Sequence, residues 1–271
     1  MKKRRRQADG KRDFFSYLSS PPSTIGPPYP YEVIMKHISQ SQINLYRKCP
    51  YAYALRYIYK KEGIWFDPSI IEVGSRVHDA VDRYYRNHLQ LNSTQSDIVN
   101  KVYEILRNQW DTTLPVDYLK KAYTCICNFA EFEFKNRKGR RGVPLTEVKI
   151  YNNGLMGIID YLDLNKPKIV DFKTNTKAFV SYDYKMQAAM YKLLVKEEYD
   201  IDLTHFTLQF LYPNEIRLIK YDDKILNVQR DIEDYVEKIQ KAWKNMNFPK
   251  EPKTPKTCNY CEYSYYCGRE E

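Results

Sequence analysis

The spacing of hydrophobic residues divides the folded part of the chain into a helical half and a half that mixes strands with helices. From Ser39 onward the apolar residues fit the 3.6-residue helical period, and Pro50 suits the first turn of a second helix. The same spacing continues through three further predicted helices, at roughly 70–90, 96–110 and 116–135. It then gives way to short β-rich segments separated by turn signals, at 143–150, 155–164 and 168–173.

Helices and strands alternate in the rest of the chain. One helix is predicted from a stripe of apolar residues, Met186, Ala189, Met190, Leu193 and Leu194. Two strands and a last helical stripe follow, at about 204–212, at about 215–221 and at Ile225, Val228, Ile232, Val236, Ile239 and Trp243. The order of helices, three strands, a helix, two strands and a helix predicts an α/β fold with a mixed central sheet flanked by helices.

Residues 1–28 break this pattern, because they combine four prolines and a basic run with few aliphatic side chains. We predict that they form a flexible basic tail. Residues 29–271 are predicted to form a single domain whose C-terminal segment, 247–271, holds three cysteines. The apolar fraction of 43% and the charged fraction of 29% are typical of a globular protein. No run of residues approaches the ~18 apolar positions that span a bilayer, so an integral membrane protein is excluded.

The net charge of +10 is concentrated in two places. Residues 1–12 hold seven Lys or Arg and one Asp, and a second basic run holds Lys135, Arg137, Lys138, Arg140 and Arg141. The rest of the chain is nearly neutral, so only the second run can inform on a binding site. The charged N-terminus is not followed by an apolar segment, which argues against a secretory signal and for a reducing, cytoplasmic location. A nuclear-type basic cluster is the alternative.

Three carboxylates and a lysine fall on successive predicted strands. Asp171 and Lys173 are two residues apart, so their side chains point to one face of their strand. Asp160 ends the apolar run of the preceding strand, and Glu147 lies one strand earlier. Carboxylates held close together raise one another's pKa, and a divalent cation removes that conflict. With a lysine to orient an attacking water, the set is typical of metal-assisted phosphodiester hydrolysis. The alternative is a turn cap at Asp160 and a surface ion pair between Asp171 and Lys173.

Two further features adjoin this set. Gln187 and Tyr191 are four residues apart on a predicted helix, so they lie one above the other and would reach the rim of the site. An amide and a phenol suit contacts to a nucleic-acid backbone, although an ordinary amphipathic edge explains the pair equally well. His78 follows Gly74 on an earlier helix. A single histidine is more often structural, but imidazole also suits a cation such as Mn²⁺.

The ordered set of motifs resembles the RecB-like branch of the PD-(D/E)xK nucleases. The residues that carry the resemblance are Gly74 to His78, Glu147, Gly157 to Asp160, Asp171 to Thr174, and Gln187 to Tyr191. It implies a restriction-endonuclease-like core that cleaves DNA with Mg²⁺ or Mn²⁺. The catalytic residues it implies are Lys173, Asp160, Asp171 and Glu147. The metal ligands it implies are His78, Asp160 and Asp171, with Gln187 and Tyr191 near the substrate.

The C-terminal segment contains a compact trio of cysteines, Cys258, Cys261 and Cys267, which is one thiolate short of a tetrahedral metal site. Cys49 is the fourth candidate. The other two cysteines are two positions apart on a predicted helix, where they face different ways and are interpreted as core residues. One cysteine before the core and three after it resembles the iron–sulfur RecB-like nucleases. This implies a 4Fe–4S cluster that joins the N- and C-terminal segments, and zinc remains the alternative for four thiolates.

Within these nucleases the chain is most similar to the CRISPR-associated Cas-four family, on the motif at 40–50 and the terminal cysteines. This resemblance implies an exonuclease on single-stranded DNA that acts in spacer acquisition, with CRISPR integrase proteins as partners and an oligomer as one form. One alternative is a repair or viral recombination nuclease on the same scaffold. The other is a non-catalytic iron–sulfur module that binds DNA. The second basic run is expected near the mouth of the site, where it would guide the DNA backbone.

Overall fold

The computed structural model of the chain describes residues 37–64, 68–140 and 142–267, and the predicted tail at 1–28 lies outside them. The first half of the described residues forms β1 (Ile38–Ser39), α2 (Gln40–Lys48), α3 (Pro50–Tyr57), α4 (Pro68–Asn87), α5 (Gln95–Asn108) and α6 (Val116–Asn136). The second half forms β2 (Leu145–Asn152), β3 (Leu155–Asp163), β4 (Lys168–Lys173), α7 (Tyr182–Tyr199), β5 (His205–Phe210), β6 (Glu215–Lys220), α8 (Asp223–Asn245) and the 3-10 helices Pro255–Tyr260 and Ser264–Cys267. The predicted order of elements from α2 to α8 is confirmed, whereas β1 and the two 3-10 helices were not predicted.

Local sequence signals fix where the first two helices begin. The Ser39 hydroxyl accepts the backbone N–H of Gln42, and the Gln42 side-chain oxygen accepts the Ser39 N–H, which is a reciprocal capping box for α2. Pro50 occupies the first turn of α3, where a missing N–H costs no helical hydrogen bond. Cys49 is left between the two helices with an extended backbone. The helix junction therefore sets the position of this cysteine.

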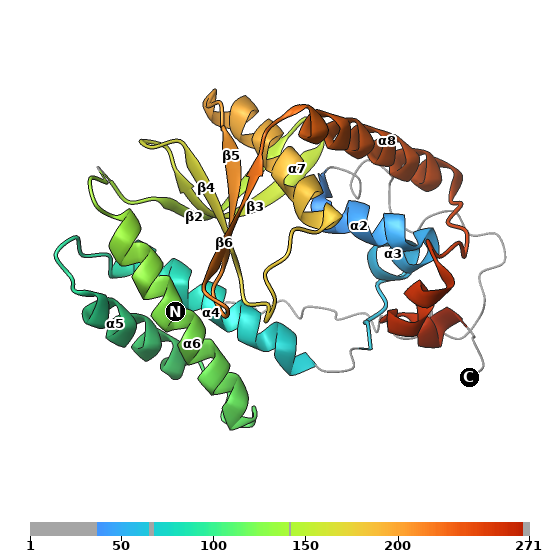
Figure 1. The fold of residues 1–271 in the computed structure, drawn as a ribbon. Coiled ribbons are helices and arrows are strands. Elements are labelled where there is room, and N and C mark those ends of the chain that lie inside the picture. Colours follow the sequence, from blue (N-terminus) through green and yellow to red (C-terminus); the bar gives the residue numbers. More distant parts are fainter. Residues whose placement is uncertain (1–36, 65–67, 141, 268–271) are drawn as a thin grey trace, which may run out of the picture.

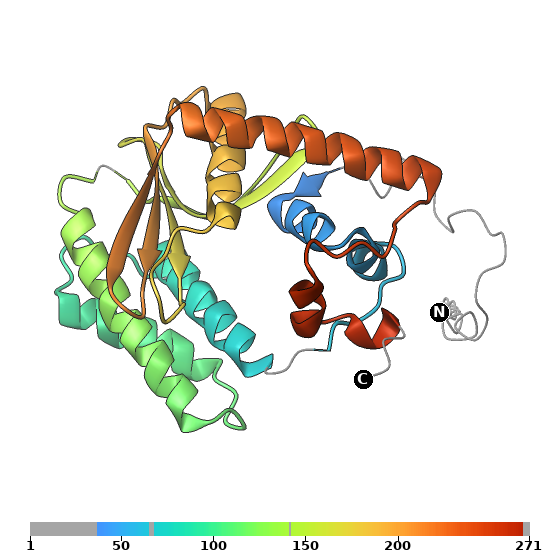
Figure 2. The ribbon, with the colours of Figure 1, turned by 45° about the vertical axis from the view of Figure 1, so that its right-hand side comes forward.

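A mixed sheet of six strands lies at the centre of the described residues. β2 with β3, β3 with β4 and β5 with β6 are antiparallel pairs, whereas β4 and β5 run parallel and are connected through α7. α4, α5 and α6 cover one face of the sheet, and α7 and α8 cover the other (Figures 1 and 2). This arrangement confirms the predicted mixed α/β fold with helices on both faces.

β4 supplies side chains to two separate hydrophobic cores. Ile169 belongs to the core under α7 and α8, while Val170 and Phe172 belong to the core under α4, α5 and α6. Strand side chains alternate between faces, so Asp171 is placed on the α7 side together with Ile169. The predicted division of this strand into two faces is confirmed, and Asp171 is almost fully buried.

The C-terminal segment packs against the start of the described chain (Figure 2). A small apolar cluster joins Cys49, Ala52 and Leu55 to Tyr263. The backbone adds a hydrogen bond of 2.7 Å from the Ile64 N–H to the Glu262 carbonyl. Segments about two hundred residues apart are thus held side by side. Within the described residues, no helix is both long enough and apolar enough to cross a bilayer.

Candidate metal and active site

One edge of β3 pairs with two different strands along its length, and the site lies between the two paired stretches. Residues 161–163 pair with β4, and residues 155–156 pair with β1. Between these two stretches, β3 pairs with no strand of the described residues on that edge. The backbone N–H of Phe172 on β4 instead donates to Asp160 Oδ2 at 2.7 Å. The carboxylate of Asp160 thus occupies the place where the ladder between β3 and β4 opens.

The backbone of β2 and β3 is distorted at the same level. Ile159 packs in the α7 and α8 core, yet Tyr161, two residues on, packs in the opposite core. Residues two apart share a face in a regular strand, so β3 must twist at Asp160. Glu147 lies between the cross-strand pairs that bracket Asp160 and has a φ of +46°, the left-handed region that is uncommon for glutamate. Strain of this kind persists only where surrounding contacts enforce it, and it is concentrated at functional sites.

The distortion brings two carboxylates to the imidazole of His78 on α4. His78 Nδ1 lies 3.4 Å from Asp160 Oδ2 and 3.6 Å from Glu147 Oε1. One ligand atom from each of the three residues lies within 4.8 Å of the other two. The side chains remain partly open to solvent, with exposed fractions of 27% for His78, 32% for Glu147 and 12% for Asp160. Oxygen and nitrogen ligands at this spacing fit a divalent cation.

The electrostatics of this group show an excess of negative charge. Burial by itself would lower the pKa of His78, but Asp160, Glu147 and Asp171 outweigh it and raise that pKa to about 9. Burial also raises the pKa of Asp160, and the nearby imidazole only partly offsets this. In the metal-free site a proton on His78 therefore neutralises part of the charge. A divalent cation would do so more completely.

Asp171 and Lys173 form a second group beside the first. Lys173 Nζ lies 2.6 Å from Asp171 Oδ2, and Gln187 Nε2 donates to Asp171 Oδ1 at 2.7 Å. Lys173 Nζ also reaches the Gln187 side-chain oxygen at 3.4 Å and stands over the Tyr184 ring. Burial lowers the pKa of Lys173, but the charges of Asp171 and Asp160 outweigh it and raise that pKa, so the ammonium form is retained.

The structure separates the predicted metal ligands into these two groups. Asp171 lies beside the compact group of three, and its carboxylate oxygens contact Lys173 and Gln187. Its role as a metal ligand, which the resemblance implies, stays a prediction. Glu147, which was predicted as a catalytic carboxylate, takes that third place. The positive φ of Glu147 explains why strand alternation could not place it.

Gln187 and Tyr191 were predicted to reach toward DNA, and the structure gives their polar groups partners inside the protein. The Tyr191 hydroxyl donates to the Ile158 carbonyl on the open edge of β3 and accepts from Gln187 Nε2 at 3.1 Å. Gly157 makes this approach possible, because a Cβ there would lie 2.9 Å from Tyr191 Cε1. The two side chains therefore position Asp171 and the backbone of β3.

A supporting contact on α4 was not predicted. Asp82, one helical turn after His78, accepts a hydrogen bond of 2.6 Å from the Thr146 hydroxyl. Arg86 donates to the same carboxylate and, at 3.3 Å, to the Thr146 carbonyl. These contacts hold the residue that precedes Glu147. The i,i+4 spacing of Asp82 from His78 is the sequence signal that could have indicated it.

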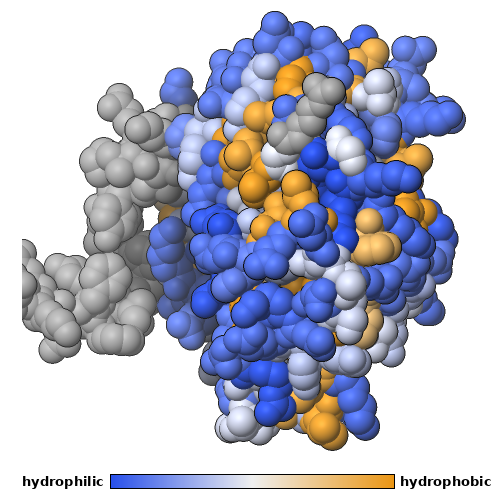
Figure 3. Space-filling model, turned by 90° about the vertical axis from the view of Figure 1, so that its left-hand side faces the viewer, coloured by the Kyte–Doolittle hydropathy of each residue, from blue (hydrophilic) through white to orange (hydrophobic). Residues whose placement is uncertain are grey.

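The second basic run does not act as one exposed patch. The Arg140 guanidinium is 1% exposed and donates to Glu133 and to the Tyr161 hydroxyl, so the prediction that it guides DNA was wrong. A buried arginine must be paired, and Glu133 is its partner. Arg137 donates to backbone carbonyls, Lys135 pairs with Glu131, and Arg141 lies outside the described residues. The face on the side of α5 and α6 is mainly hydrophilic, with hydrophobic side chains in a few small groups (Figure 3).

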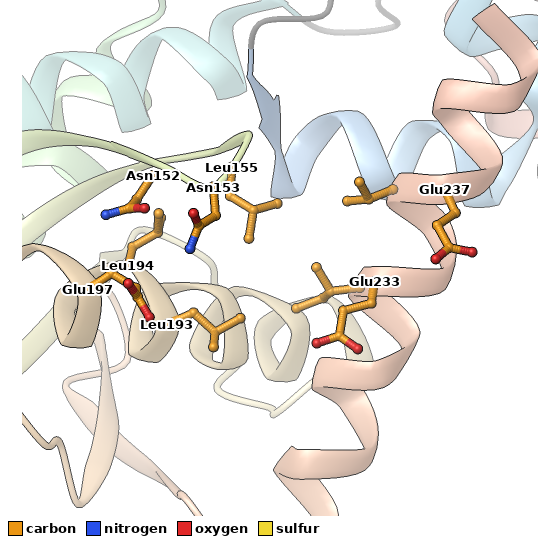
Figure 4. Close-up of a pocket in the computed structure, with 10 residues that line it drawn as sticks. Asn152, Asn153, Leu155, Leu193, Leu194, Glu197, Glu233 and Glu237 are labelled. Carbon is orange, nitrogen blue, oxygen red and sulfur yellow. The ribbon is translucent and has the colours of Figure 1, made fainter. Parts of the chain in front are cut away.

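A half-open pocket of about 310 Å³ lies away from these charged groups, between the β2–β3 turn, α7 and α8 (Figure 4). Leu155, Leu193 and Leu194 line it, with Glu197, Glu233 and Glu237 among its acidic residues. None of the predicted site residues lines it. The candidate active site is therefore the partly open group of charges at the β3 edge.

The four predicted cluster cysteines come together at the C-terminal segment. Cys49, Cys261 and Cys267 belong to one small apolar cluster. Burial raises the pKa of Cys261, and the neighbouring Cys267, Cys49 and Cys258 thiols raise it further. Among the described residues no three cysteine sulfurs lie within 4.8 Å of one another. Thiolates bound to a single zinc would stand about 3.8 Å apart, given Zn–S bonds of about 2.3 Å in a tetrahedron.

The remaining two cysteines lie elsewhere. Cys125 is fully buried in the core under α4, α5 and α6, where burial raises its pKa to about 12, and Cys127 is half-buried on α6. The interpretation of Cys125 as a core residue is confirmed. A buried thiol with so high a pKa is a poor metal ligand, because the thiolate is the ligating form.

Comparison with known proteins assigns this fold and site to a family. The PD-(D/E)XK nuclease superfamily model matches residues 37–268, and the chain belongs to that superfamily. A curated relative, "Uncharacterized protein RT0391" of Rickettsia typhi, is 27% identical over 147 residues, which cover 46% of this chain. The match spans only 17% of that relative. The crystal structure of a "Putative exonuclease" from Eubacterium rectale superposes with a TM-score of 0.51 at 18% identity, over 83% of this chain and 87% of that one, which shows a shared fold.

Proposed function

We propose that the chain is a divalent-metal-dependent deoxyribonuclease that removes nucleotides from the ends of single-stranded DNA. The observation that carries the proposal is the compact group of His78, Glu147 and Asp160 next to the Lys173 ammonium. Two carboxylates and an imidazole supply cation ligands, and the ammonium supplies a positive charge for a phosphate. Membership of a nuclease superfamily supports phosphodiester hydrolysis as the reaction.

The three clustered residues would hold the cation. Glu147 and Asp160 offer the oxygen ligands that Mg²⁺ prefers, and the His78 nitrogen also suits Mn²⁺. A divalent cation at this place would polarise a phosphoryl oxygen. Asp82 and Thr146 would keep Glu147 in reach of His78 through the contacts to β2.

Lys173 would stabilise negative charge on the scissile phosphate or orient the attacking water. Its raised pKa keeps the proton on Nζ near neutral pH, so it acts as a donor and not as a general base. Asp171 and Gln187 contact Nζ at 2.6 and 3.4 Å and fix its direction. In this assignment Asp171 contributes mainly by positioning Lys173, and Gln187 and Tyr191 contribute by positioning Asp171.

The test is digestion of end-labelled DNA by the metal-free protein to which Mg²⁺, Mn²⁺ or EDTA is added. Linear single strands should be shortened stepwise with either cation, while EDTA should stop the reaction. Circular single strands and blunt duplexes of the same sequence are the controls and should stay intact. Cleavage of the circle would replace the exonuclease with an endonuclease. A parent protein that binds DNA but cuts none of the substrates would favour the non-catalytic alternative.

We further propose that Cys49, Cys258, Cys261 and Cys267 bind a 4Fe–4S cluster. The resemblance to iron–sulfur nucleases motivates this. One observation supports it: Cys49, Cys258 and Cys267 lie near enough to Cys261 to raise the pKa of its thiol. Shared ligation would close a loop of 208 residues between Cys49 and Cys258, so ligand binding would stabilise the fold.

Anaerobic purification followed by iron, sulfide and zinc analysis tests the cluster. About four irons and four sulfides per chain are expected for this cluster type, with a brown colour. Cys258→Ala should lose colour and thermal stability together, and Cys125→Ala, the matched control outside the cluster, should keep the iron. One zinc and no iron would overturn the cluster and leave the nuclease proposal intact.

For the biological setting, we propose CRISPR adaptation in the cytoplasm, with integrase proteins as partners. The motif at 40–50 and the terminal cysteine trio support it by resemblance. Capture of new spacers by a host that carries the gene, compared with a host that carries the Asp160→Asn variant, is the test. Equal capture, or a gene that lies in a helicase or viral operon, would favour the repair or recombination alternative.

A further inference from the structure

Exposed aromatic rings and lysines meet where the C-terminal segment packs on the start of α3. Lys250 Nζ stands 4.9 Å from the Tyr51 ring centroid and donates to the Cys267 carbonyl at 3.2 Å. Lys61 Nζ stands 5.6 Å from the Tyr266 ring, whose centroid is 5.6 Å from that of Tyr265 at an interplanar angle of 81°. We define the tyrosine–lysine patch by these contacts as Tyr51, Lys61, Lys250, Tyr265 and Tyr266.

The rings of this patch remain available to a ligand. Tyr265 is 77% exposed. Tyr260, on the same segment, is 83% exposed. Single exposed apolar side chains are ordinary, but here the exposed Tyr265 ring packs edge-on against Tyr266, a ring that itself lies beside the Lys61 ammonium group.

Two described stretches that flank the patch, 60–62 and 250–256, carry a net positive charge. They hold five lysines and two glutamates, namely Lys60, Lys61, Lys250, Lys253, Lys256, Glu62 and Glu251. The acid that lies closest in the C-terminal segment, Glu262, pairs with Arg56 at 3.6 Å. A ligand that is both aromatic and anionic matches this combination of rings and cations better than a neutral or basic one.

We propose that the tyrosine–lysine patch binds single-stranded DNA, with a base stacked on Tyr265 and phosphates contacted by Lys61 and Lys250. Stacking on exposed rings beside cations is how proteins hold single strands without reading their sequence. The edge-on contact between Tyr265 and Tyr266 leaves a face of Tyr265 open to a base. This inference deepens the proposed function, on which it rests, by naming a strand-binding surface apart from the residues that cut.

The test measures binding in the full chain with the hydrolysis-deficient substitution Asp160→Asn as background. A fluorescent oligothymidine, a matched abasic strand and their anisotropy report the affinity. Tyr265→Ala should weaken binding of oligothymidine about fivefold or more, which is the lower range for loss of one stacked base. Tyr265→Phe should bind like the background, because it keeps the ring. Tyr123→Ala, an exposed tyrosine on α6, should also bind like the background.

The abasic strand separates stacking from charge. Tyr265→Ala should not affect binding of the abasic strand. Lys61→Gln and Lys250→Gln should weaken binding of both strands. They should also flatten the log–log salt dependence of binding by about 0.7 for each phosphate that is no longer neutralised. Unchanged affinity of oligothymidine for Tyr265→Ala, with iron content equal to the background, would overturn the proposal. An absence of cleavage by the parent protein would overturn the nuclease function instead, since binding is measured without cleavage.

Discussion

Two clusters of charged side chains adjoin neighbouring residues of β3, and they differ in charge balance and in exposure to solvent. Next to Tyr161, the Glu133 and Arg140 side chains are 0% and 1% exposed, and one acid faces one base. The Tyr85 hydroxyl donates to Glu133, and the Tyr161 hydroxyl accepts from Arg140. Next to Asp160, the acids outnumber the bases and the group opens to solvent.

The balance of charge distinguishes buried charges that are structural from those that are stabilised by a cation. In a matched, hydrogen-bonded pair each charge is neutralised by its partner. Removal of one partner should therefore lower stability and affect activity only through the fold. A group with excess negative charge is stabilised by a cation from outside, so its removal should cost activity and spare the metal-free fold. The predictions below test this contrast.

The largest effect is expected on catalysis. Asp160→Asn should reduce cleavage of single-stranded DNA by about a thousandfold or more, because the loss of a group that holds the cation removes several kcal/mol of transition-state stabilisation. Its melting temperature in EDTA should equal that of the parent or exceed it, since one repelling carboxylate is gone. Asp202→Asn, a surface acid, is the control for activity. A large fall in melting temperature for Asp160→Asn would contradict the contrast.

The next largest effect is on stability. Glu133→Gln should lower the free energy of unfolding by about 3–5 kcal/mol, because it leaves the Arg140 charge buried and unpaired. Glu131→Gln, two positions away on the same helix, breaks a surface pair with Lys135 and should cost at most about 1 kcal/mol. Urea unfolding measures both. Equal costs for the two variants would show that the buried pair has no special role.

A third effect concerns the cation itself. Saturating Mn²⁺ at about a hundred times its dissociation constant should stabilise the folded parent by about 2.7 kcal/mol. His78→Ala and Glu147→Ala should lose this stabilisation, whereas Lys173→Met should keep it and still be inactive. Differential scanning fluorimetry with and without Mn²⁺ measures the shift. Stabilisation that survives in both His78→Ala and Glu147→Ala would place the cation elsewhere.

The smallest effect is expected from the exposed part of the second basic run. Lys135→Gln with Lys138→Gln should weaken DNA binding only slightly and flatten the log–log salt dependence by at most about 0.7 for each phosphate that these lysines neutralise. Arg140→Gln should instead behave like Glu133→Gln and lower stability. Anisotropy at several salt concentrations, together with urea unfolding, distinguishes the exposed lysines from the buried arginine.

Local rules account for what the sequence predicted well. Helices and strands follow the spacing of apolar residues, and the common face of Asp171 and Lys173 follows from strand alternation alone. The gathering of Cys49 with the terminal trio was expected from a family resemblance. None of these expectations required knowledge of where a strand loses its partner.

The features that the sequence could not predict all depend on such long-range events. Glu147 reaches His78 only because its backbone adopts a positive φ opposite a twist in β3. Tyr191 turns inward because β3 presents an unpaired carbonyl at Ile158. Arg140 is buried because the chain after α6 brings it back onto Glu133. A sequence shows that a residue is charged, but the pairing of that charge is decided by the tertiary fold.

The most direct measurement is a titration of Mn²⁺ into metal-free protein in which bound cation and cleavage of an end-labelled single strand are followed in the same samples. We predict that cleavage rises in parallel with cation bound at the His78, Glu147 and Asp160 group, and that Asp160→Asn loses both together. Cleavage by the parent protein that continues in EDTA at the rate measured with Mn²⁺ would contradict the account. Cleavage that survives in Asp160→Asn would contradict it as well.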